Sequence, residues 1–264
     1  MQTWRLIPLE THNAFLNMAI DEAVLTARSI NRAPNTLRIY QWKPSAVSIG
    51  KNQQAENEAH LDNCRRLGVS VVRRISGGGT VYHDAKDEAT YSIIAKLEDL
   101  RVNDAIAVYS KVYEGITGAL RILGITTDFN PGDIKNCPNL TVKNKKISGS
   151  SQARKRETIL QHGTLLLNID LERMFTLLRV PWAKTCMEVV AVAEKKITSV
   201  KNEVGHEVSA ETAANALTVG FRNAIAAEIA EGELTRFELE LAEKLCKEKY
   251  STDEWNLRGK SVIC

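Results

Sequence analysis

The sequence predicts an α+β (mixed α/β) fold on three observations. Strand-like and helix-like segments are mixed along the chain rather than strictly alternating, which argues against a barrel of repeated βα units. A chain of 264 residues is long enough for one large domain with a sizeable core. Its composition, 44% hydrophobic and 25% charged residues, is ordinary for a soluble globular protein and excludes a disordered or fibrous chain.

The first part of the chain predicts strands interrupted by two helices. A strand is expected at Thr3–Leu9 and an amphipathic helix at Asn17–Ser29. Thr36–Trp42 alternates apolar and polar residues and Ala46–Ile49 continues after a turn, which predicts two strands of one sheet. Ala55–Leu67 predicts a polar helix. Apolar, β-branched runs predict three more strands, at Val69–Ile75, Val81–Tyr82 and Ala89–Ile94.

The second part begins with the clearest helix. Asn103–Leu123 places its apolar side chains on one face and ends before a glycine. A loop rich in Gly, Pro, Asn and Asp is expected over Asp128–Asn139, followed by a strand at Leu140–Val142, a turn, and a segment of small residues at Ile147–Gln152. Thr158–Leu167 predicts a strand. The remaining periodic segments predict helices, at Leu171–Leu178, Ala210–Ile229 and Leu239–Lys249.

Charge and cysteine content exclude several classes of protein. Thirty-five Lys and Arg against 32 Asp and Glu give a net charge of only +3, so nucleic acid is not an expected partner. No apolar run approaches the roughly 20 residues of a membrane helix, and residues 1–8 show no charged leader before an apolar stretch, so we expect a cytoplasmic protein without membrane contact. The five cysteines are scattered, with none at CxxC spacing, which predicts neither disulfides nor a metal site.

The sharpest local feature is a run of three glycines between two predicted strands, Arg73-Arg74-Ile75-Ser76-Gly77-Gly78-Gly79-Thr80. Successive glycines lose much backbone entropy on folding, but they leave backbone N–H groups open to an anion. Because side chains alternate along a strand, Arg73 and Arg74 are expected to point to opposite faces, which lets one of them hold a phosphate or carboxylate. A glycine-rich hairpin with solvent-exposed arginines is the alternative.

Two further segments carry groups that suit an anionic substrate. Lys145 and Lys146 end a strand-like piece before a turn of small residues, where one ammonium group is expected to neutralise a carboxylate or phosphate. The alternative for these lysines is a charged hairpin tip. His162 and Gly163 lie within a strand run, where the histidine borders a ligand, acts as a base, or has a structural role only.

Together these segments resemble the signatures of lipoate–protein ligases. Residues 73–84 are similar to the RRxxGGGxVxHD signature of that family, residues 145–152 to its KxxGS segment, and residues 160–167 to its HHGTLLL-like strand. Residues 17–23 and 249–256 resemble the first helix of the family and the end of its large domain. The resemblance covers nearly the whole chain and implies a biotin/lipoate ligase-like fold, a mixed β-sheet core flanked by helices, in one catalytic domain spanning residues 1–264.

The resemblance also implies an activity. Lipoate–protein ligases use ATP and Mg²⁺ to activate lipoate, or octanoate, as an acyl-AMP. They then pass the acyl group to a lysine of a lipoyl domain, on a 2-oxoacid dehydrogenase acyltransferase subunit or the glycine-cleavage H protein. By position, Lys146 is the expected catalytic residue, between the acyl carbonyl and the phosphate. The residues expected to bind the nucleotide and the acyl group are Arg74, Gly77, Gly78, Gly79, Thr80, Val81, Tyr82, Asn139, Lys146, Gly149, His162 and Gly163.

Two features depart from the pattern of the family. Pro138-Asn139 stands where the family often has Asn-Asp, and asparagine is a weaker Mg²⁺ ligand than a carboxylate, so no metal ligand is assigned. The chain stops after Trp255-Asn256, which resembles the split form of these ligases, in which a separate accessory subunit supplies the C-terminal domain. The resemblance therefore implies an accessory subunit as a partner.

Cysteine-dependent octanoyl- or lipoyl-transferases of the same superfamily are the alternative. They move an acyl group between carrier proteins through a thioester, and Cys137 lies broadly where they hold their nucleophile. Against this, the glycine loop reads Gly77-Gly78-Gly79 and not GGR, and the sequence shows no base to activate Cys137. The sequence therefore favours an ATP-dependent ligase, with a transferase as the alternative and a non-catalytic binding module as a third hypothesis.

Overall fold

The computed structural model describes residues 3–133 and 137–260, and two β-sheets organise them. The larger sheet has the strand order β11-β1-β2-β6-β10-β9-β8-β7. Its strands are β1 (Trp4–His12), β2 (Thr36–Trp42), β6 (Glu88–Lys96), β7 (Asp128–Asn130), β8 (Asn139–Val142), β9 (Lys145–Lys155), β10 (Thr158–Leu166) and β11 (Ile229–Glu231). Strand β1 pairs in parallel with β2 and β11, and the other neighbours pair antiparallel. The smaller sheet has the order β4-β3-β5, with β3 (Ala46–Ile49), β4 (Ser70–Arg73) and β5 (Val81–His83).

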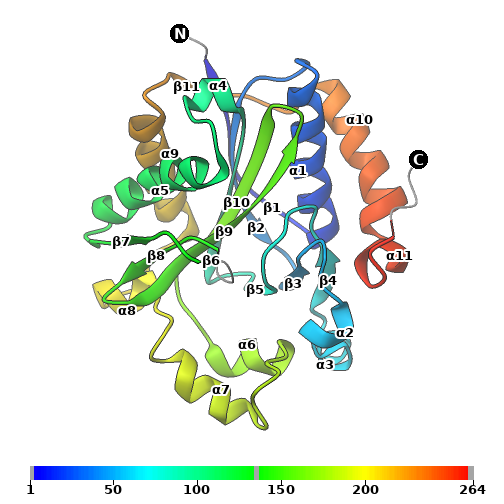
Figure 1. The fold of residues 1–264 in the computed structure, drawn as a ribbon, viewed down its shortest axis with the longest axis vertical. Coiled ribbons are helices and arrows are strands. Elements are labelled where there is room, and N and C mark those ends of the chain that lie inside the picture. Colours follow the sequence, from blue (N-terminus) through cyan, green and yellow to red (C-terminus); the bar gives the residue numbers. More distant parts are fainter. Residues whose placement is uncertain (1–2, 134–136, 261–264) are drawn as a thin grey trace.

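Helices cover both faces of the larger sheet (Figure 1). The helices on one face are α5 (Ala105–Ile122) and α9 (Ala210–Ile225), and those on the other are α1 (Ala14–Ser29) and α10 (Arg236–Leu245). Strand β6 shows how one strand serves both layers, because Tyr91 and Ile93 belong to the core under α5 and α9, whereas Ile94 belongs to the core under α1 and α10. A strand buried on both faces needs apolar residues at successive positions, as β6 has.

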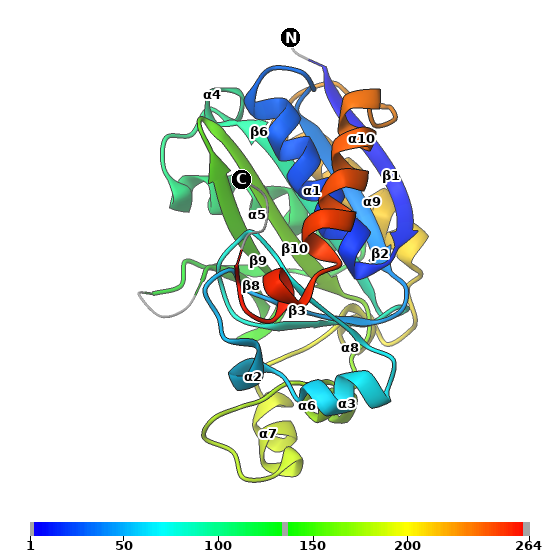
Figure 2. The same cartoon turned by 90° about the vertical axis from the view of Figure 1, so that its right-hand side faces the viewer.

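Short helices gather at one end of the molecule, beside the smaller sheet (Figure 2). They are α2 (Ala55–Glu58), α3 (Leu61–Arg66), α6 (Leu171–Leu177) and α7 (Cys186–Ala193). The remaining helices are α4 (Leu97–Leu100), α8 (Val200–Val204), the π-helical turn η1 (Cys246–Tyr250) and α11 (Asp253–Asn256). None of the helices in the described residues has the length and apolar character needed to cross a membrane.

The mixed α/β class and most predicted segments are confirmed, but local predictions fail where distant segments intervene. Strands β2 and β3 lie in different sheets, because β2 pairs with β1 and β6 while β3 pairs with β4 and β5. The predicted helix at residues 55–67 is split between α2 and α3. Ala59 forms a bridge with Leu178, and the N–H of His60 donates to the carbonyl of Leu177 at 2.8 Å, so both residues take part in a tertiary contact instead of a helix.

Two predicted boundaries in the second part are also wrong. The helix predicted to Ile229 ends at Ile225, because Ala226 takes a left-handed conformation (φ 51°) and Ile229 begins the edge strand β11. Lys145 and Lys146 begin strand β9 and do not end the preceding one. The turn predicted after Leu140–Val142 is confirmed and lies before them, at Lys143 and Asn144, which both have positive φ (49° and 65°), as a tight hairpin turn requires.

Candidate active site

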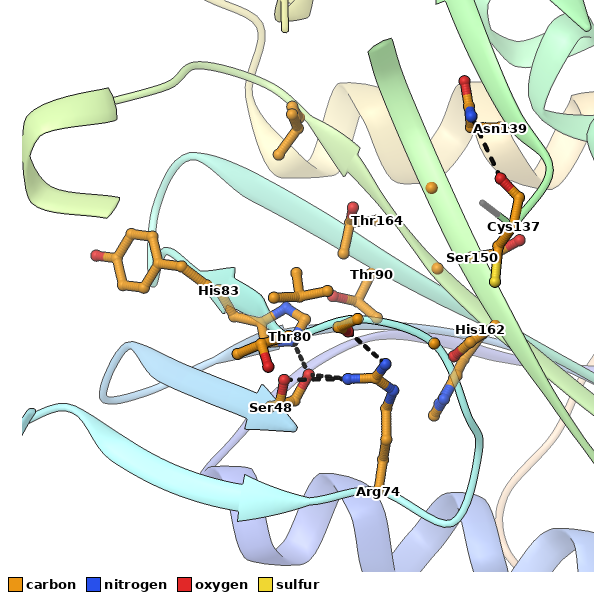
Figure 3. A pocket seen from close by; sticks show the side chains of 18 of the residues that line it. Ser48, Arg74, Thr80, His83, Thr90, Cys137, Asn139, Ser150, His162 and Thr164 are labelled. Atoms are coloured by element: carbon orange, nitrogen blue, oxygen red, sulfur yellow. Dashed lines mark hydrogen bonds between the residues drawn. The ribbon is translucent and has the colours of Figure 1, made fainter. Parts of the chain in front are cut away.

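A cavity of about 670 Å³ is lined by residues of both sheets and of α6 (Figure 3). Its lining brings together the three segments singled out in the sequence, from the glycine loop, from β9 and from β10. The predicted residues that line it are Arg74, Gly78, Gly79, Thr80, Val81, Tyr82, Asn139, Lys146, Gly149, His162 and Gly163. Gly77 is not part of the lining, and Cys137 is.

The glycine loop is a crossover and not the hairpin considered above. Strands β4 and β5, which it connects, lie on either side of β3 and do not pair with each other. Gly78 has a φ of +82°, a conformation that favours glycine, and a Cβ on Gly50 would lie 2.2 Å from the Gly78 carbonyl oxygen. The loop therefore packs backbone against backbone, which explains the glycines at both positions.

Arg74 is 4% exposed and holds the glycine loop through hydrogen bonds to the loop backbone. Its five N–H groups all have acceptors: Ser76 Oγ (3.2 Å), Ser48 O (3.0 Å), Ser48 Oγ (3.1 Å), Gly77 O (2.7 Å) and Gly79 O (2.6 Å). Burial lowers the pKa of Arg74 to about 10, so the side chain remains charged at neutral pH. Arg74 thus fixes the glycine loop, and its predicted contact with a nucleotide stays a prediction.

Arg73 points to the opposite face, as the strand alternation predicts. It is 1% exposed, and its guanidinium donates to carbonyl groups of residues 50, 51, 53, 255 and 257. The C-terminal segment thereby joins the loop after β3. Because both arginines are buried and hydrogen-bonded within the protein, the alternative of solvent-exposed arginines is wrong.

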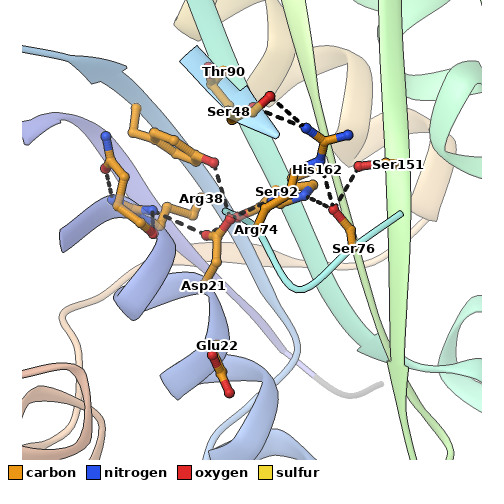
Figure 4. A network of polar contacts seen from close by, with 12 residues as sticks. Asp21, Glu22, Arg38, Ser48, Arg74, Ser76, Thr90, Ser92, Ser151 and His162 are labelled. Carbon is orange, nitrogen blue, oxygen red and sulfur yellow. Dashed lines mark hydrogen bonds and ion pairs between the residues drawn. The ribbon is translucent and has the colours of Figure 1, made fainter. Parts of the chain in front are cut away.

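Two buried chains, each running from a carboxylate through a histidine to a serine, support Arg74. Figure 4 shows the first of them. In the first, Asp21 Oδ2 lies 2.9 Å from His162 Nδ1, and His162 Nε2 lies 2.6 Å from Ser76 Oγ. Burial, with smaller effects from Arg74 and His83, lowers the pKa of His162 even though Asp21 raises it, so the ring is neutral at pH 7. Its Nδ1 then donates to Asp21 and its Nε2 accepts from Ser76. With both nitrogens occupied, His162 supports the loop and is not free to act as a base.

The second chain runs through His83. Glu88 Oε1 lies 2.7 Å from His83 Nδ1, and His83 Nε2 lies 2.8 Å from Ser48 Oγ. The His83 ring stacks on Trp42, with the centroids 4.0 Å apart. Ser48, like Ser76 in the first chain, accepts a hydrogen bond from Arg74. The sequence left the role of His162 open and did not single out His83, and nothing in it paired the two histidines with acids 5 and 141 positions away.

Lys146 reaches into the cavity from the start of β9. Its side chain passes directly over Gly149, where an added Cβ would lie 2.5 Å from both Cε and Nζ of the lysine. Within residues 3–133 and 137–260, no hydrogen bond or ion pair of Nζ is found, and the side chain lines the cavity. Burial within the cavity walls lowers the pKa of Lys146, the charge of Cys137 opposes that shift, and Arg74 adds to it.

Cys137 faces the same space from the segment before β8. A Cβ on Gly78 would lie 3.8 Å from its sulfur, and its exposed thiol interacts electrostatically with Lys146 and Arg74. Asn139 donates to the Cys137 carbonyl at 3.3 Å (Figure 3). The tertiary structure therefore supplies what the sequence did not show, a nearby amine whose pKa is lowered beside the cysteine.

Solved structures define the class of protein. The bi-partite lipoate protein ligase from Thermoplasma acidophilum, studied with its E2 lipoyl domain, superimposes with a TM-score of 0.84 at 30% identity over 100% of both chains. A lipoate-protein ligase A bound with ATP superimposes with a TM-score of 0.83 at 29% identity, over 97% of this chain and 99% of the other. The predicted lipoate ligase-like fold is confirmed, and the chain is an enzyme of the family that shares this fold.

Comparison of the sequence with known proteins identifies the family of this chain. Residues 13–222 match the model of the lipoyl protein ligase A/B catalytic domain, and the chain belongs to this family. It is 34% identical to the octanoyltransferase LipM of Clostridioides difficile (strain 630), over 97% of this chain and 99% of the relative. It is 37% identical to the octanoyltransferase LipM of Kyrpidia tusciae, over 98% and 100%.

These relatives correct the predicted activity. An ATP-dependent lipoate–protein ligase was the favoured prediction, and it is wrong because relatives aligned over the whole chain are named octanoyltransferases. The sequence undervalued Cys137 because it showed no base to activate that cysteine. ATP is bound in the ligase structure named above, and the predicted use of ATP and Mg²⁺ belongs to the ligase interpretation.

Proposed function

We propose that this enzyme is an octanoyltransferase that carries the acyl group on Cys137. The observation that carries the proposal is the placement of the Cys137 thiol and the Lys146 amine in one cavity, beside the open backbone of Gly78. A nucleophile with an adjacent base is the arrangement that covalent acyl transfer requires. The names of the relatives support octanoyl as the group transferred.

The cavity suits an acyl chain. Its volume, about 670 Å³, lies in the range of about 300–1,000 Å³ found for small-molecule sites. Apolar side chains from three parts of the fold line it, namely Met18, Tyr40, Trp42, Leu166, Met174, Phe175 and Leu178. A hydrocarbon chain gains free energy by leaving water for such a surface. The thioester end would then lie at the polar side, beside Cys137 and Lys146.

In the first half-reaction, the proton of Cys137 passes to Nζ of Lys146, and the thiolate adds to the carbonyl carbon of an octanoyl thioester on a carrier protein. The ammonium so formed lies beside the oxygen that gains negative charge. The bond from the carbonyl to the carrier sulfur breaks, the octanoyl group stays on Cys137, and the carrier thiolate recovers the proton from Lys146.

In the second half-reaction, the neutral ε-amine of an acceptor lysine adds to the carbonyl of octanoyl-Cys137. The bond to the Cys137 sulfur breaks, an amide forms, and the proton lost by the amine passes through Lys146 to the departing thiolate. A lipoyl domain is the acceptor that we propose, supported by the structural similarity to a ligase studied with its E2 lipoyl domain. No adenylate is needed, because the thioester is already activated.

Mass spectrometry tests this proposal directly. The enzyme is mixed with an octanoyl thioester of a carrier protein without ATP, and one octanoyl group is expected on Cys137. Addition of a lipoyl domain should move that group to a lysine of the domain. Cys137→Ser should abolish transfer, whereas Cys186→Ser, a half-buried cysteine on α7, is the matched control and should transfer normally.

The base is tested with Lys146→Ala. Acylation of Cys137 is expected to slow by about 10²–10⁴-fold, the usual contribution of a general base. Octanoyl transfer that persists in Cys137→Ser, or that occurs only with ATP and free octanoate, would refute the proposal.

A further inference from the structure

The turn that follows β3 brings a side chain with no assigned role to the cavity. Gln53 lies in this turn and lines the cavity together with Thr80, which follows the three glycines. The residues expected to bind substrate did not include Gln53, since a single glutamine in a loop has no motif around it. Its hydrogen bonds show that the structure holds it in one orientation.

The main chain of this turn is held by Arg73. One nitrogen of the Arg73 guanidinium donates to the carbonyl groups of Gly50 (3.0 Å), Lys51 (3.1 Å) and Gln53 (2.6 Å). The N–H of Gln53 donates to the Gly50 carbonyl at 3.1 Å. Arg73 is itself fixed, because Trp255 Nε1 donates to its carbonyl at 2.8 Å. Both backbone groups of Gln53 are therefore occupied, which leaves its side chain to meet a ligand.

The side-chain amide of Gln53 has a fixed orientation. The backbone N–H of Gly50 donates to Gln53 Oε1 at 2.7 Å, and because an N–H can only donate, this atom is the amide oxygen and not the nitrogen. The Thr80 hydroxyl donates to the same oxygen at 3.0 Å. Across residues 3–133 and 137–260, Nε2 makes no hydrogen bond, so both of its N–H groups can donate to a ligand. A donor held in advance loses little side-chain freedom when the ligand binds.

Gly78 lies close to both this amide and Cys137. A Cβ on Gly50 would lie 2.2 Å from the Gly78 carbonyl oxygen and 3.2 Å from Gln53 Oε1. A Cβ on Gly78 would lie 3.8 Å from the Cys137 sulfur. The glutamine therefore lies near the carbonyl of Gly78 and the cysteine near its Cα. A Cβ on Gly79, the next residue, would meet no atom within 4 Å, so a chain attached at the cysteine has open space along the glycine loop.

The surroundings of Gln53 favour a neutral acceptor. Glu58 Oε2 lies 3.2 Å from Thr80 Oγ1, and this carboxylate disfavours a phosphate or carboxylate of the substrate at the same place. The thiol arm of an acyl carrier protein offers a neutral acceptor, because two methylene groups link its sulfur to an amide. When Cys137 attacks the thioester, the octanoyl chain occupies the apolar part of the cavity and this arm remains on the polar side. The carbonyl of its amide is a group that an N–H donor beside the glycine loop can recognise.

We propose, resting on the proposed function, that Gln53 is a substrate-binding residue whose Nε2 donates a hydrogen bond to the amide carbonyl oxygen of the thiol arm that delivers the octanoyl group. The amide lies outside the bonds that form and break, so this contact strengthens the binding of the thioester and of the transition state alike. Gln53 thereby distinguishes a thioester on an amide-bearing arm from other thioesters. Cys137 and Lys146 keep the roles already given to them.

The first test compares two small thioesters. S-octanoyl-N-acetylcysteamine carries the amide, and S-pentyl thiooctanoate has a hydrocarbon chain of the same length in its place. Acylation of Cys137 by each is followed by intact-protein mass spectrometry. Each second-order rate constant is divided by the rate constant with which the same thioester acylates a small free thiol. The ratio of the two corrected values defines the amide preference of the enzyme.

Gln53→Glu removes the donor and keeps the acceptor. A carboxylate oxygen can still accept from Gly50 and Thr80, but the variant side chain has no N–H. The amide preference is expected to fall by about three- to tenfold, the effect of one neutral hydrogen bond, through weaker binding of the amide-bearing thioester. Gln53→Met, which adds no charge, should lower the preference by a similar factor. An unchanged preference in these variants would overturn the proposal.

Gln54→Glu is the matched control. Gln54 is exposed, lies outside the cavity lining and also accepts a hydrogen bond through Oε1, from Asn57 at 2.8 Å. The same change of charge at this next residue should leave the amide preference at the wild-type value. A fall as large as that in Gln53→Glu would show that charge near the cavity, and not the lost donor, is responsible, which would refute the role of Gln53.

Binding to Cys137→Ser separates this proposal from the proposed function, because that variant has no thiol to acylate. Calorimetry should show that S-octanoyl-N-acetylcysteamine binds about three- to tenfold more tightly to Cys137→Ser than to the double variant that also carries Gln53→Glu. If wild type forms no octanoyl-Cys137 but this difference in affinity is found, the proposed function is wrong and the Gln53 contact stands. If octanoyl-Cys137 forms and the amide preference is the same in wild type and Gln53→Glu, the transferase function stands and the role of Gln53 is refuted.

Discussion

Replacing Gly149 with alanine is expected to disable Lys146 while leaving the fold intact. A Cβ at this position lies 2.5 Å from both Cε and Nζ of Lys146, and the next nearest atom, Cδ, is 4.0 Å away. Non-bonded heavy atoms prefer separations of about 3.5–4.0 Å, so the tip of the lysine must move by roughly 1 Å or more. The atoms that must move are the far end of a flexible side chain, so little strain reaches the sheet.

The consequence for catalysis follows from that displacement. A misplacement of about 1 Å costs on the order of 10²-fold in rate, so acylation of Cys137 in Gly149→Ala should fall by about that factor. To measure the rate, the enzyme is mixed with an octanoyl thioester and samples are quenched at intervals. The fraction of acylated enzyme in each sample is then determined by intact-protein mass spectrometry. The melting temperature, measured alongside, should stay at the wild-type value or rise slightly, because alanine has less backbone freedom in the unfolded chain than glycine.

A double-mutant cycle decides whether the effect passes through the lysine. Gly149→Ala is expected to add little to the loss caused by Lys146→Ala alone, since the displaced group is then missing. The reasoning is refuted if Gly149→Ala acylates at nearly the wild-type rate, or if it causes an equally large further loss in the Lys146→Ala background.

Three other outcomes concern stability. Gly163→Ala should lower the free energy of unfolding by about 1–3 kcal/mol or more, because its Cβ would lie 2.5 Å from a β9 carbonyl oxygen; an unchanged denaturant midpoint would contradict this. The pKa of Lys146 is lowered below its ordinary 10.5, so the unfolded chain binds more protons and stability rises with pH up to that value. Lys146→Met should therefore melt higher than wild type near pH 7 but not above about pH 10.5, and a lower melting temperature near pH 7 would refute this. Burial raises the pKa of Asp21, but the hydrogen bond from His162 and the charge of Arg38 outweigh it, so the folded pKa lies below 3.8. The stabilisation by the ionised Asp21 carboxylate is present above pH 3.8 and is lost as the pH falls through the folded pKa. The melting temperature of Asp21→Asn should therefore depend less on pH than that of wild type below about pH 4. Parallel plots of melting temperature against pH for variant and wild type would count against the pairing of Asp21 with His162 and Arg38.

Sequence alone determined the features that depend on local pattern. The 3.6-residue period of α5 and the alternation of β2 are set by neighbouring side chains, and both elements occur where they were predicted. Strand alternation likewise sent Arg73 and Arg74 to opposite faces, and the glycine, lysine and histidine segments do line one cavity. The family could be recognised because those segments keep their residue types and order.

The tertiary structure decided which chemical groups meet. Cys137 and Lys146 are nine positions apart and the sequence offers no rule that pairs a loop cysteine with a lysine beyond a hairpin turn. Here the turn at Lys143-Asn144 folds β8 against β9, so the cysteine segment and the lysine reach the same cavity. Local periodicity fixes the face of a helix or strand on which a side chain lies. The interaction partners, burial and pKa of that side chain depend on segments that become neighbours only in the folded protein.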